Sequence, residues 1–530
     1  MAKQLLTGEA ARNALKTGIQ TLAGAVSVTL GPKGKNVVLD RKYATPLVTN
    51  DGVSIAKEIE LENPFENMGA NLIKEVSIKT NDNAGDGTTT ACVLAESMVV
   101  CGLKNIASGA NPILLRKGIE KAVAVAINHL KEISKPVSSD LEITQIASIS
   151  AGDEEIGKLI SSAFKKVGKD GVISIEESKT SSTSLKVTQG LEFERGYISP
   201  YMAPQDTGVA ILENPYILVT DKKISNINDL LPILEQIMKT SRPLLIIAED
   251  VDGDALSTLA LNTIRGSFNS VAVKAPSFGE KQKDYLEDIS LLTGAELVVK
   301  ELKSDLKDLT LDDLGEAATV KVYKDRTTII GGKSKTDKIE ELRISLRQKL
   351  SEELDSYEKI NVEDRLARLS DGVAVIEVGA ASEIEMREKK LRIEDSLSAT
   401  KSATKEGIVI GGGCALLSCV DSISDLISTL DGDEKTGAEI VRLALESPLR
   451  QISKNAGVDD GVVIENVKKN LSQNIGYNAL TGEYVNMFEQ GIIDPTKVTR
   501  CALENAGSVA SSILTTEVLV TDVPEKTKAS

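Results

Sequence analysis

The sequence predicts a multidomain protein of mixed α+β and α/β class. It should have a mainly helical domain built from both ends of the chain, a small α/β linker domain, and an α/β domain inserted in the middle. The 530 residues are enough for about three or four domains. The apolar pattern changes along the chain from helical to mixed to α/β, then returns through mixed to helical. In the middle, residues 244–248, 252–265 and 271–273 read as strand, helix and strand, a βαβ unit typical of a parallel sheet.

The N-terminal part is mainly helical. Residues 5–30 carry apolar positions at helical spacing, and we expect this helix to end at Gly31-Pro32-Lys33-Gly34. That loop could approach an anion through its backbone N–H groups and its lysine, but a simple helix breaker explains it equally well. Residues 36–40 and 46–49 then predict a short β-hairpin, and Asp51 follows where the chain passes from strand to helix.

A glycine- and threonine-rich stretch, Ala84-Gly85-Asp86-Gly87-Thr88-Thr89-Thr90, lies between two helical segments. Its glycines permit a tight turn, and the threonines open a helix whose first N–H groups are free to bind a phosphate. A carboxylate beside phosphate requires a cation between them, so Asp86 is the candidate Mg²⁺ ligand. An N-cap followed by an ordinary turn is the alternative, because Asp-Gly pairs occur at several other places in the chain.

The middle of the chain divides into a smaller mixed segment, residues 137–188, and an α/β segment, residues 189–373. After its first buried strand the α/β segment has an acidic turn at 249–254 and no glycine-rich loop, which disfavours a nucleotide phosphate there. Two apolar helices, at 227–239 and 252–265, carry several leucines. The residues alone favour burial of most of these leucines in the core of this segment.

The remainder returns to helical sequence. Residues 338–369 predict a charged helical hairpin, and residues 373–378 a strand that leads back toward the linker domain. The next helix, at 383–405, carries Asp395. Helices then continue to about residue 517, and residues 516–522 could form an edge strand.

Composition excludes several classes of function. The formal charge of −16 argues against nucleic acid or an anionic membrane as partner, and no apolar run approaches the length of a membrane span. Five cysteines without a C-x-x-C pair, and no signal-peptide core, favour free thiols and a cytoplasmic location. A single histidine, His129 in a predicted helix, leaves carboxylates as the groups for any catalysis. Few aromatic residues are present for stacking on bases or sugars.

Five motifs occur in order along the chain and resemble those of group I chaperonins of the GroEL type. They are Thr29-Leu30-Gly31-Pro32-Lys33-Gly34, Asp51-Gly52-Val53, Ala84 to Thr90, Gly411-Gly412-Gly413 and Asp494-Pro495-Thr496-Lys497-Val498-Thr499-Arg500. The resemblance covers about residues 1–525. It implies two stacked seven-membered rings of this chain, which bind non-native polypeptides and enclose them under a GroES-like co-chaperonin lid while ATP is hydrolysed.

The resemblance also implies a division of the chain into three nested domains. These are an equatorial domain (1–135 and 407–523), an intermediate domain (136–188 and 374–406) and an apical domain (189–373). Residues 524–530 would form a disordered tail. Gly190 and Gly372 would lie at the two connections of the apical domain.

Site residues follow from the resemblance in the same way, with ATP, Mg²⁺ and K⁺ as cofactors. Asp395 would be the general base and Asp51 would help to position the attacking water, while Asp86 would hold Mg²⁺. The implied nucleotide-binding residues are Thr29, Leu30, Gly31, Pro32, Asn50, Asp86, Gly87, Thr88, Thr89, Thr90, Gly412, Asn478, Ala479, Leu480 and Asp494. A base carried on a separate hinged domain would make hydrolysis wait for domain closure.

An apolar polypeptide-binding face is implied in the apical domain, which reverses the core interpretation above for several residues. Its residues would be Tyr197, Tyr201, Met202, Leu231, Leu234, Leu256, Ala260 and Leu261, whereas Leu259 would remain in the core. An exposed apolar groove is what capture of unfolded chains requires.

The sequence departs from the family at three places. Asn50 replaces a lysine, Met202 replaces an aromatic residue, and the chain ends without a Gly-Gly-Met tail. Two other functions therefore stay open: a chaperonin-like paralogue that holds polypeptides but hydrolyses ATP weakly, and a small-molecule kinase that uses the same phosphate loop.

Overall fold

The computed structural model describes residues 2–40, 46–168, 171–178, 180–188, 190–205, 207–299, 306–333, 336–350, 362, 365–366, 369 and 372–522. The chain forms two compact units. Unit 1 comprises Met1–Ser162, Glu177–Thr183 and Val378–Ser530, and unit 2 comprises Ala163–Glu176 and Ser184–Glu377. Both ends of the chain therefore build one unit, and its middle builds the other. The finer division into three nested domains stays a prediction.

Unit 1 is mainly helical, as the apolar periodicity of the two chain ends indicates. Its helices are α1 (Gly8–Ser27), α2 (Gly52–Glu58), α3 (Pro64–Ala84), α4 (Thr88–Ala107), α5 (Pro112–Glu132), α6 (Asp140–Ala151), α13 (Glu383–Glu406), α14 (Cys414–Ser428), α15 (Gly432–Ala444), α16 (Ser447–Asn455), α17 (Asp460–Asn470) and α18 (Thr496–Leu514). Its paired strands are β1 (Lys3–Thr7) with β20 (Val518–Asp522), β2 (Val37–Leu39) with β3 (Leu47–Thr49), β16 (Ile408–Ile410) with β19 (Ile493–Pro495), and β17 (Ile475–Asn478) with β18 (Glu483–Asn486). α7 (Glu154–Val167) runs from unit 1 into unit 2.

Local capping fixes where the helices near the nucleotide motif begin and end. The Asn63 side chain accepts the Phe65 N–H ahead of Pro64, which starts α3. Gly85 ends α3 with a φ of 73°, in the left-handed region that favours glycine. At α6, Ser139 and Glu142 form a reciprocal capping box. These capping signals are local in the sequence, although α6 itself was not among the predicted helices.

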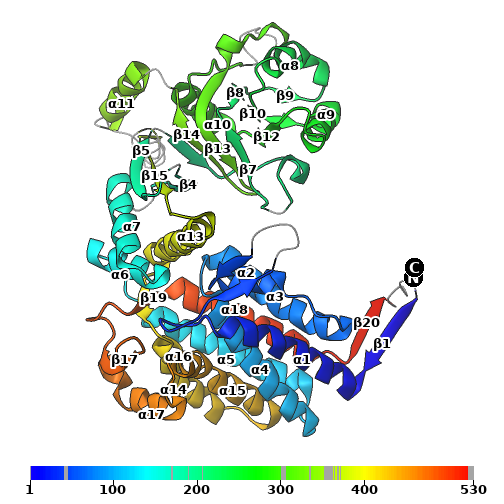
Figure 1. Cartoon of the computed structure of the whole chain (residues 1–530), viewed down its shortest axis with the longest axis vertical. Helices are drawn as coiled ribbons and strands as arrows, with labels where there is room; N and C mark the ends of the chain where they lie inside the picture. The colour runs from blue at the N-terminus through cyan, green and yellow to red at the C-terminus, as the bar shows by residue number, and fades with distance from the viewer. Residues whose placement is uncertain are drawn as a thin grey trace. The chain divides into compact units, whose positions relative to one another are not determined.

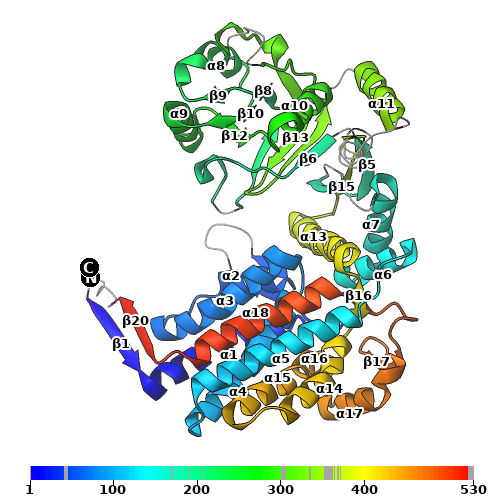
Figure 2. The same cartoon turned by 180° about the vertical axis from the view of Figure 1, so that it is seen from behind.

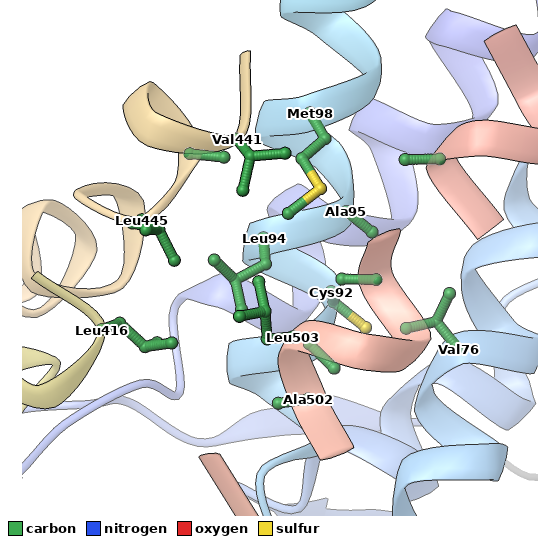
Figure 3. Close-up of a cluster of buried hydrophobic side chains, with 14 of the residues drawn as sticks. Val76, Cys92, Leu94, Ala95, Met98, Leu416, Val441, Leu445, Ala502 and Leu503 are labelled. Atoms are coloured by element: carbon green, nitrogen blue, oxygen red, sulfur yellow. The ribbon is translucent and has the colours of Figure 1, made fainter. Parts of the chain in front are cut away.

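The core of unit 1 forms around α4. This helix is apolar on most of its surface and packs against α1, α3, α15 and α18. Figure 3 shows Leu94 and Met98 of α4 directed toward Val441 of α15 and toward Leu445, which follows that helix. In the described part of the chain, α4 is the one helix long and apolar enough to cross a membrane. Its packing makes it a core helix.

A two-stranded ribbon joins the two ends of the chain. β1 and β20 pair antiparallel, with Leu5 opposite Val520, and lie side by side in Figures 1 and 2. The predicted edge strand near residue 520 is confirmed. The prediction that the first helix begins at about residue 5 is wrong, because Leu5 and Leu6 belong to β1 and α1 begins at Gly8. The partner of this strand comes from the far end of the chain, so the pairing cannot be recognised in the local sequence.

Unit 2 contains a seven-stranded mixed sheet with the order β12-β10-β8-β13-β14-β6, in which β7 also pairs with β13. The strands β8, β10 and β12 run parallel, and α9 joins β10 to β12, so the predicted βαβ unit is confirmed. The strands are β6 (Gly190–Phe193), β7 (Ala210–Glu213), β8 (Tyr216–Val219), β10 (Leu244–Ala248), β12 (Ser270–Lys274), β13 (Gly315–Val322) and β14 (Thr327–Gly332). The helices are α8 (Leu231–Met238), α9 (Gly253–Ile264), α10 (Gly279–Thr293) and α11 (Thr336–Leu350).

A smaller three-stranded sheet accompanies these elements. It has the order β4-β15-β5, from Ile173–Glu177, Val373–Val378 and Ser184–Thr188. The predicted strand at 373–378 is therefore confirmed. Of the predicted helical hairpin at 338–369, α11 covers the first part, and most of the remainder lies outside the described residues.

His129 and the cysteines have no arrangement that suggests catalysis. The His129 ring lies within hydrogen-bond distance of Ser418 and Ser422 on α14, at 3.4 and 3.1 Å. All five cysteines are free, as predicted.

Candidate functional site

Four aspartates from separate elements of unit 1 lie close enough for their charges to interact. Asp51 caps α2, Asp86 lies in the turn between α3 and α4, Asp395 is on α13, and Asp494 is on β19. Loss of hydration is the main cause that raises the pKa of Asp86, Asp395 and Asp494. The charge of Asp51 adds to it at Asp86 and Asp395, and the charge of Asp86 adds to it at Asp395 and Asp494. All four residues are partly exposed, so a ligand can reach them.

The turn that holds Asp86 cannot accept larger residues at its glycines. Gly85 and Gly87 have φ values of 73° and 81°. A Cβ atom at Gly85 would lie 2.2 Å from Ser398 Cβ, and one at Gly87 would lie 2.6 Å from Val498 Cγ1. The turn is thus fixed by conformation and by packing against α13 and α18.

This turn presents the N-terminus of α4. Gly87 is the N-cap residue of α4 and provides no side-chain cap, so the first N–H groups of the helix have no acceptor within it. Thr88 and Thr89 are buried, and Thr90 is partly exposed. N–H groups, hydroxyls and the positive end of the helix dipole therefore gather next to Asp86, as an anionic ligand requires.

The loops before α2 and after α1 approach the same helix end. A Cβ atom at Gly52 would lie 2.5 Å from Thr89 Oγ1 and 2.7 Å from Thr88 Oγ1. The Thr29 and Thr89 hydroxyls are 3.2 Å apart. Asp51 accepts the N–H groups of Val53 and Ser54 at 3.1 and 3.0 Å, which orients its carboxylate. Thr29, Asp51 and the threonine motif, far apart in the sequence, are thus brought together.

Asp395 lies on α13, where loss of hydration and three neighbouring carboxylates act on it together. Loss of hydration raises its pKa well above the ordinary value, and the charges of Asp51, Asp86 and Glu394 raise it further. The next residue, Ser396, donates its hydroxyl to the Ala147 carbonyl of α6 at 2.7 Å. Ser402 donates to the Ala84 carbonyl at 2.9 Å, which ties α13 to the end of α3.

Asp86 is held by two hydrogen bonds. Its Oδ1 accepts the Gly87 N–H, and its Oδ2 accepts the Ser150 hydroxyl at 2.8 Å. Loss of hydration raises the pKa of Asp86, and these two bonds lower it in part. Ser150 was not among the predicted site residues, because no motif surrounds it and α6 is far from the glycine loop in the sequence.

Asp494 lies where β16 and β19 pair. Val409 is its partner in the register, and a Cβ atom at Gly411 would lie 3.1 Å from Asp494 Oδ1. Gly412 has a φ of 63° and faces Met487. Burial raises the pKa of Asp494 to about 7, with a smaller contribution from the charge of Asp86.

This pKa gives a prediction for stability. A folded-state pKa above the unfolded value stabilises the fold at low pH, and the stabilisation is lost as pH rises toward 7. The stability of Asp494→Asn relative to the wild type should therefore increase as pH rises from about 5 to about 8. One pKa unit corresponds to about 1.4 kcal/mol, and partial exposure reduces the effect, so we expect a gain of the order of 2 kcal/mol. Thermal unfolding without nucleotide at both pH values measures it, and equal shifts at both would contradict it.

The remaining predicted nucleotide-binding residues lie on other loops and strands of unit 1. Asn478 ends β17, and its side-chain oxygen accepts the Leu480 N–H at 3.0 Å. Ala479 is buried, whereas Leu480 is exposed. The Leu30 carbonyl accepts Asn455 Nδ2 at 2.8 Å, and a Cβ atom at Gly31 would meet Ile452, both on α16. Pro32 and Asn50 are exposed.

The four aspartates and the N-terminus of α4 fit a magnesium nucleotide better than a metal ion alone. Among the described residues, no set of three or more His, Cys, Asp or Glu side chains is arranged to hold a metal. Mg²⁺ bound with a nucleotide takes one or two carboxylates and completes its shell with phosphate oxygens and water. The charged neighbours that shift the pKa values of Asp86, Asp395 and Asp494 are carboxylates, so a cation would relieve their repulsion.

The predicted polypeptide-binding residues of unit 2 fall into two groups. Tyr201, Leu231 and Leu261 are exposed, by 59%, 41% and 45%. Tyr197 and Leu256 are partly buried against the core.

The other three residues, Met202, Leu234 and Ala260, are buried in the core of unit 2 at 1%, 8% and 7% exposure. Their side chains therefore supply little exposed surface: Leu234 of α8 and Ala260 of α9 lie on the buried faces of their helices, and Met202 belongs to the same core cluster. The prediction that Leu259 is a core residue is confirmed.

Comparison with known proteins relates the chain to a single family. Residues 22–524 match the TCP-1/cpn60 chaperonin family. Among solved structures, the chaperonin gp146 from bacteriophage EL 2 (Pseudomonas aeruginosa) is similar over 98% of this chain and 99% of its own, with 23% identity and a TM-score of 0.69. A second crystal form of gp146 gives 22% identity and a TM-score of 0.63 over the same shares. Both gp146 crystals were obtained in the presence of ATP-BeFx.

Proposed function

Because this chain belongs to the TCP-1/cpn60 chaperonin family, we propose that it is an ATP-dependent molecular chaperone. It captures non-native polypeptides on exposed apolar side chains of unit 2 and encloses them for folding, driven by hydrolysis of Mg-ATP in unit 1. The observation that carries the proposal is the gathering of Asp51, Asp86 and Asp395 around the uncapped N-terminus of α4. The ATP-BeFx present with the similar gp146 supports the choice of nucleotide.

The threonine motif binds the phosphates. The N–H groups of Thr88, Thr89 and Thr90 and the threonine hydroxyls donate to phosphate oxygens. Asp86 holds the magnesium ion, with Ser150 and Gly87 fixing its carboxylate. When bound, Mg²⁺ neutralises charge that develops on the phosphates during transfer.

Asp395 acts as general base toward the attacking water, and Asp51 positions that water. A carboxylate with a raised pKa is a stronger base than an ordinary aspartate, which suits removal of a proton from water. Asp51 keeps a fixed orientation because two backbone N–H groups of α2 hold its oxygens. Asp494, Gly412, Asn478, Ala479 and Leu480 contact the base and ribose.

The assembly proposed is a homo-oligomer of two stacked seven-membered rings, closed by a GroES-like lid, with K⁺ as a second cation. Asn50 would bind the K⁺ ion through its backbone carbonyl, so the identity of its side chain would matter little. The exposed position of the Asn50 side chain supports this role.

Electron microscopy with and without ATP, combined with ATPase rates, tests the proposal. We expect large rings and Mg²⁺-dependent hydrolysis by the wild type. Asn50→Lys should change kcat by less than about threefold. Both residues offer the same backbone carbonyl, and a charge added at an exposed position changes interaction energies by only about 0.5 kcal/mol. A large gain on Asn50→Lys would favour the weakly hydrolysing holdase. A compact monomer that turns over a small molecule would favour the kinase.

A further inference from the structure

Ser150 links the nucleotide-site carboxylate to a helix that also contacts α13. Asp86 accepts one backbone bond, from its neighbour Gly87, and one side-chain bond, from Ser150, which is 64 positions away in the sequence. One turn earlier on the same face of α6, the Ala147 carbonyl accepts the Ser396 hydroxyl at 2.7 Å. The Ala151 carbonyl accepts Arg392 Nη1 at 3.4 Å. α6 therefore contacts Asp86 directly and the segment of α13 that carries Asp395.

The Asp86 carboxylate needs this support because its surroundings repel it. The charges of Asp51, Asp395 and Asp494 all interact with that of Asp86. Rotation about the last bond of an aspartate side chain is soft, so repulsion alone would turn the carboxylate away from its neighbours. The Ser150 hydroxyl opposes this rotation, since a hydrogen bond to a charged oxygen is stronger than one between neutral groups.

We propose that Ser150 is a positioning residue that acts through Asp86: it holds the carboxylate in the orientation that receives the cation, and α6 keeps that orientation in register with Asp395. This inference rests on the proposed function and adds a residue to its metal site. Partners that orient a metal ligand commonly change metal affinity or activity by about 10- to 100-fold when removed.

A set of single variants in the full-length assembled protein tests the inference. Ser150→Ala removes the hydroxyl, and Ser150→Thr keeps it. Ser148→Ala is the matched control on the same helix, because the Ser148 hydroxyl bonds only within α6 to the Thr144 carbonyl among the bonds described, at 2.7 Å. The readouts are the Mg²⁺ concentration that gives half-maximal binding of a fluorescent ATP analogue, and KM and kcat for ATP at low and saturating Mg²⁺.

We expect Ser150→Ala to raise the half-maximal Mg²⁺ concentration by about tenfold or more, with recovery of kcat at high Mg²⁺. Ser150→Thr and Ser148→Ala should stay within about twofold of the wild type, since both leave the Asp86 bond in place. A purely structural serine would lower the melting temperature and leave the Mg²⁺ dependence unchanged.

The outcomes separate this inference from the function on which it rests. A wild-type protein that binds nucleotide with Mg²⁺, together with Ser150→Ala at the same Mg²⁺ midpoint, overturns the role of Ser150 alone. A wild-type protein that shows no Mg²⁺-dependent nucleotide binding overturns both. Should Ser150→Ala fail to assemble, Ser150→Val against Ser150→Thr decides, because these variants have the same shape and differ in the hydroxyl.

Discussion

Asp395→Ala is expected to lower kcat for ATP hydrolysis by about 10²- to 10⁴-fold, the usual contribution of a general base. Binding of Mg-ATP should persist or become tighter, since removing one of four mutually repelling carboxylates lowers the repulsion around Asp86. Steady-state ATPase assays and nucleotide titrations on the assembled protein measure both quantities. A lower rate together with retained or tighter binding is a combination that a general loss of structure cannot produce.

Glu394→Ala is the matched control for this variant. Glu394 is the neighbouring acid on α13. Loss of hydration is the main cause of the raised pKa of Asp395, and the charge of Glu394 is the smallest of the contributions to it. Its removal should lower that pKa slightly and leave kcat within about threefold of the wild type. An Asp395→Ala variant that hydrolyses ATP as fast as the Glu394→Ala variant would remove Asp395 from the mechanism.

Much of the architecture could be predicted because its signals are local. Strand β10 is an uninterrupted apolar run, and α13 begins at a capping serine, Ser382, so both can be recognised in a short window. The glycine-threonine turn is also local, since its two glycines and three threonines are consecutive with Asp86. The presence of a single histidine in the sequence also argued against a catalytic mechanism that uses histidine.

What could not be predicted depends on contacts between distant segments. β1 has too few residues to stand out, and its partner β20 lies at the opposite end of the chain. Ser150 is an ordinary helical serine until α6 packs beside the Asp86 turn. Periodicity could not separate the exposed from the buried leucine of α8 either, because six of its eight residues are apolar, proline included, and only Glu235 and Gln236 are polar.

The arrangement of α8 yields a pair of substitutions with different expected results. Leu231 and Leu234 are neighbours on the same helix, but Leu231 is 41% exposed and Leu234 is 8% exposed. The motif resemblance predicts that both bind polypeptide, whereas their different burial predicts different roles. Leu231→Ser removes exposed apolar surface, and Leu234→Ser places a hydroxyl in the core of unit 2.

We expect Leu231→Ser to weaken capture of a chemically denatured protein by about tenfold, as loss of about 1.4 kcal/mol from a binding surface would. Its ATPase rate and melting temperature should equal those of the wild type. Leu234→Ser should instead lower the stability of unit 2 by about 2–5 kcal/mol, and any loss of capture should follow its unfolding. Binding of denatured client, followed by light scattering, and thermal melts of both variants distinguish the two.

Leu443→Ser, at a leucine of unit 1 that is 47% exposed, is the surface control. If Leu231→Ser still captures client like this control, the exposed side chains of α8 take no part in capture, because the substitution removes apolar surface without disturbing the fold beneath it.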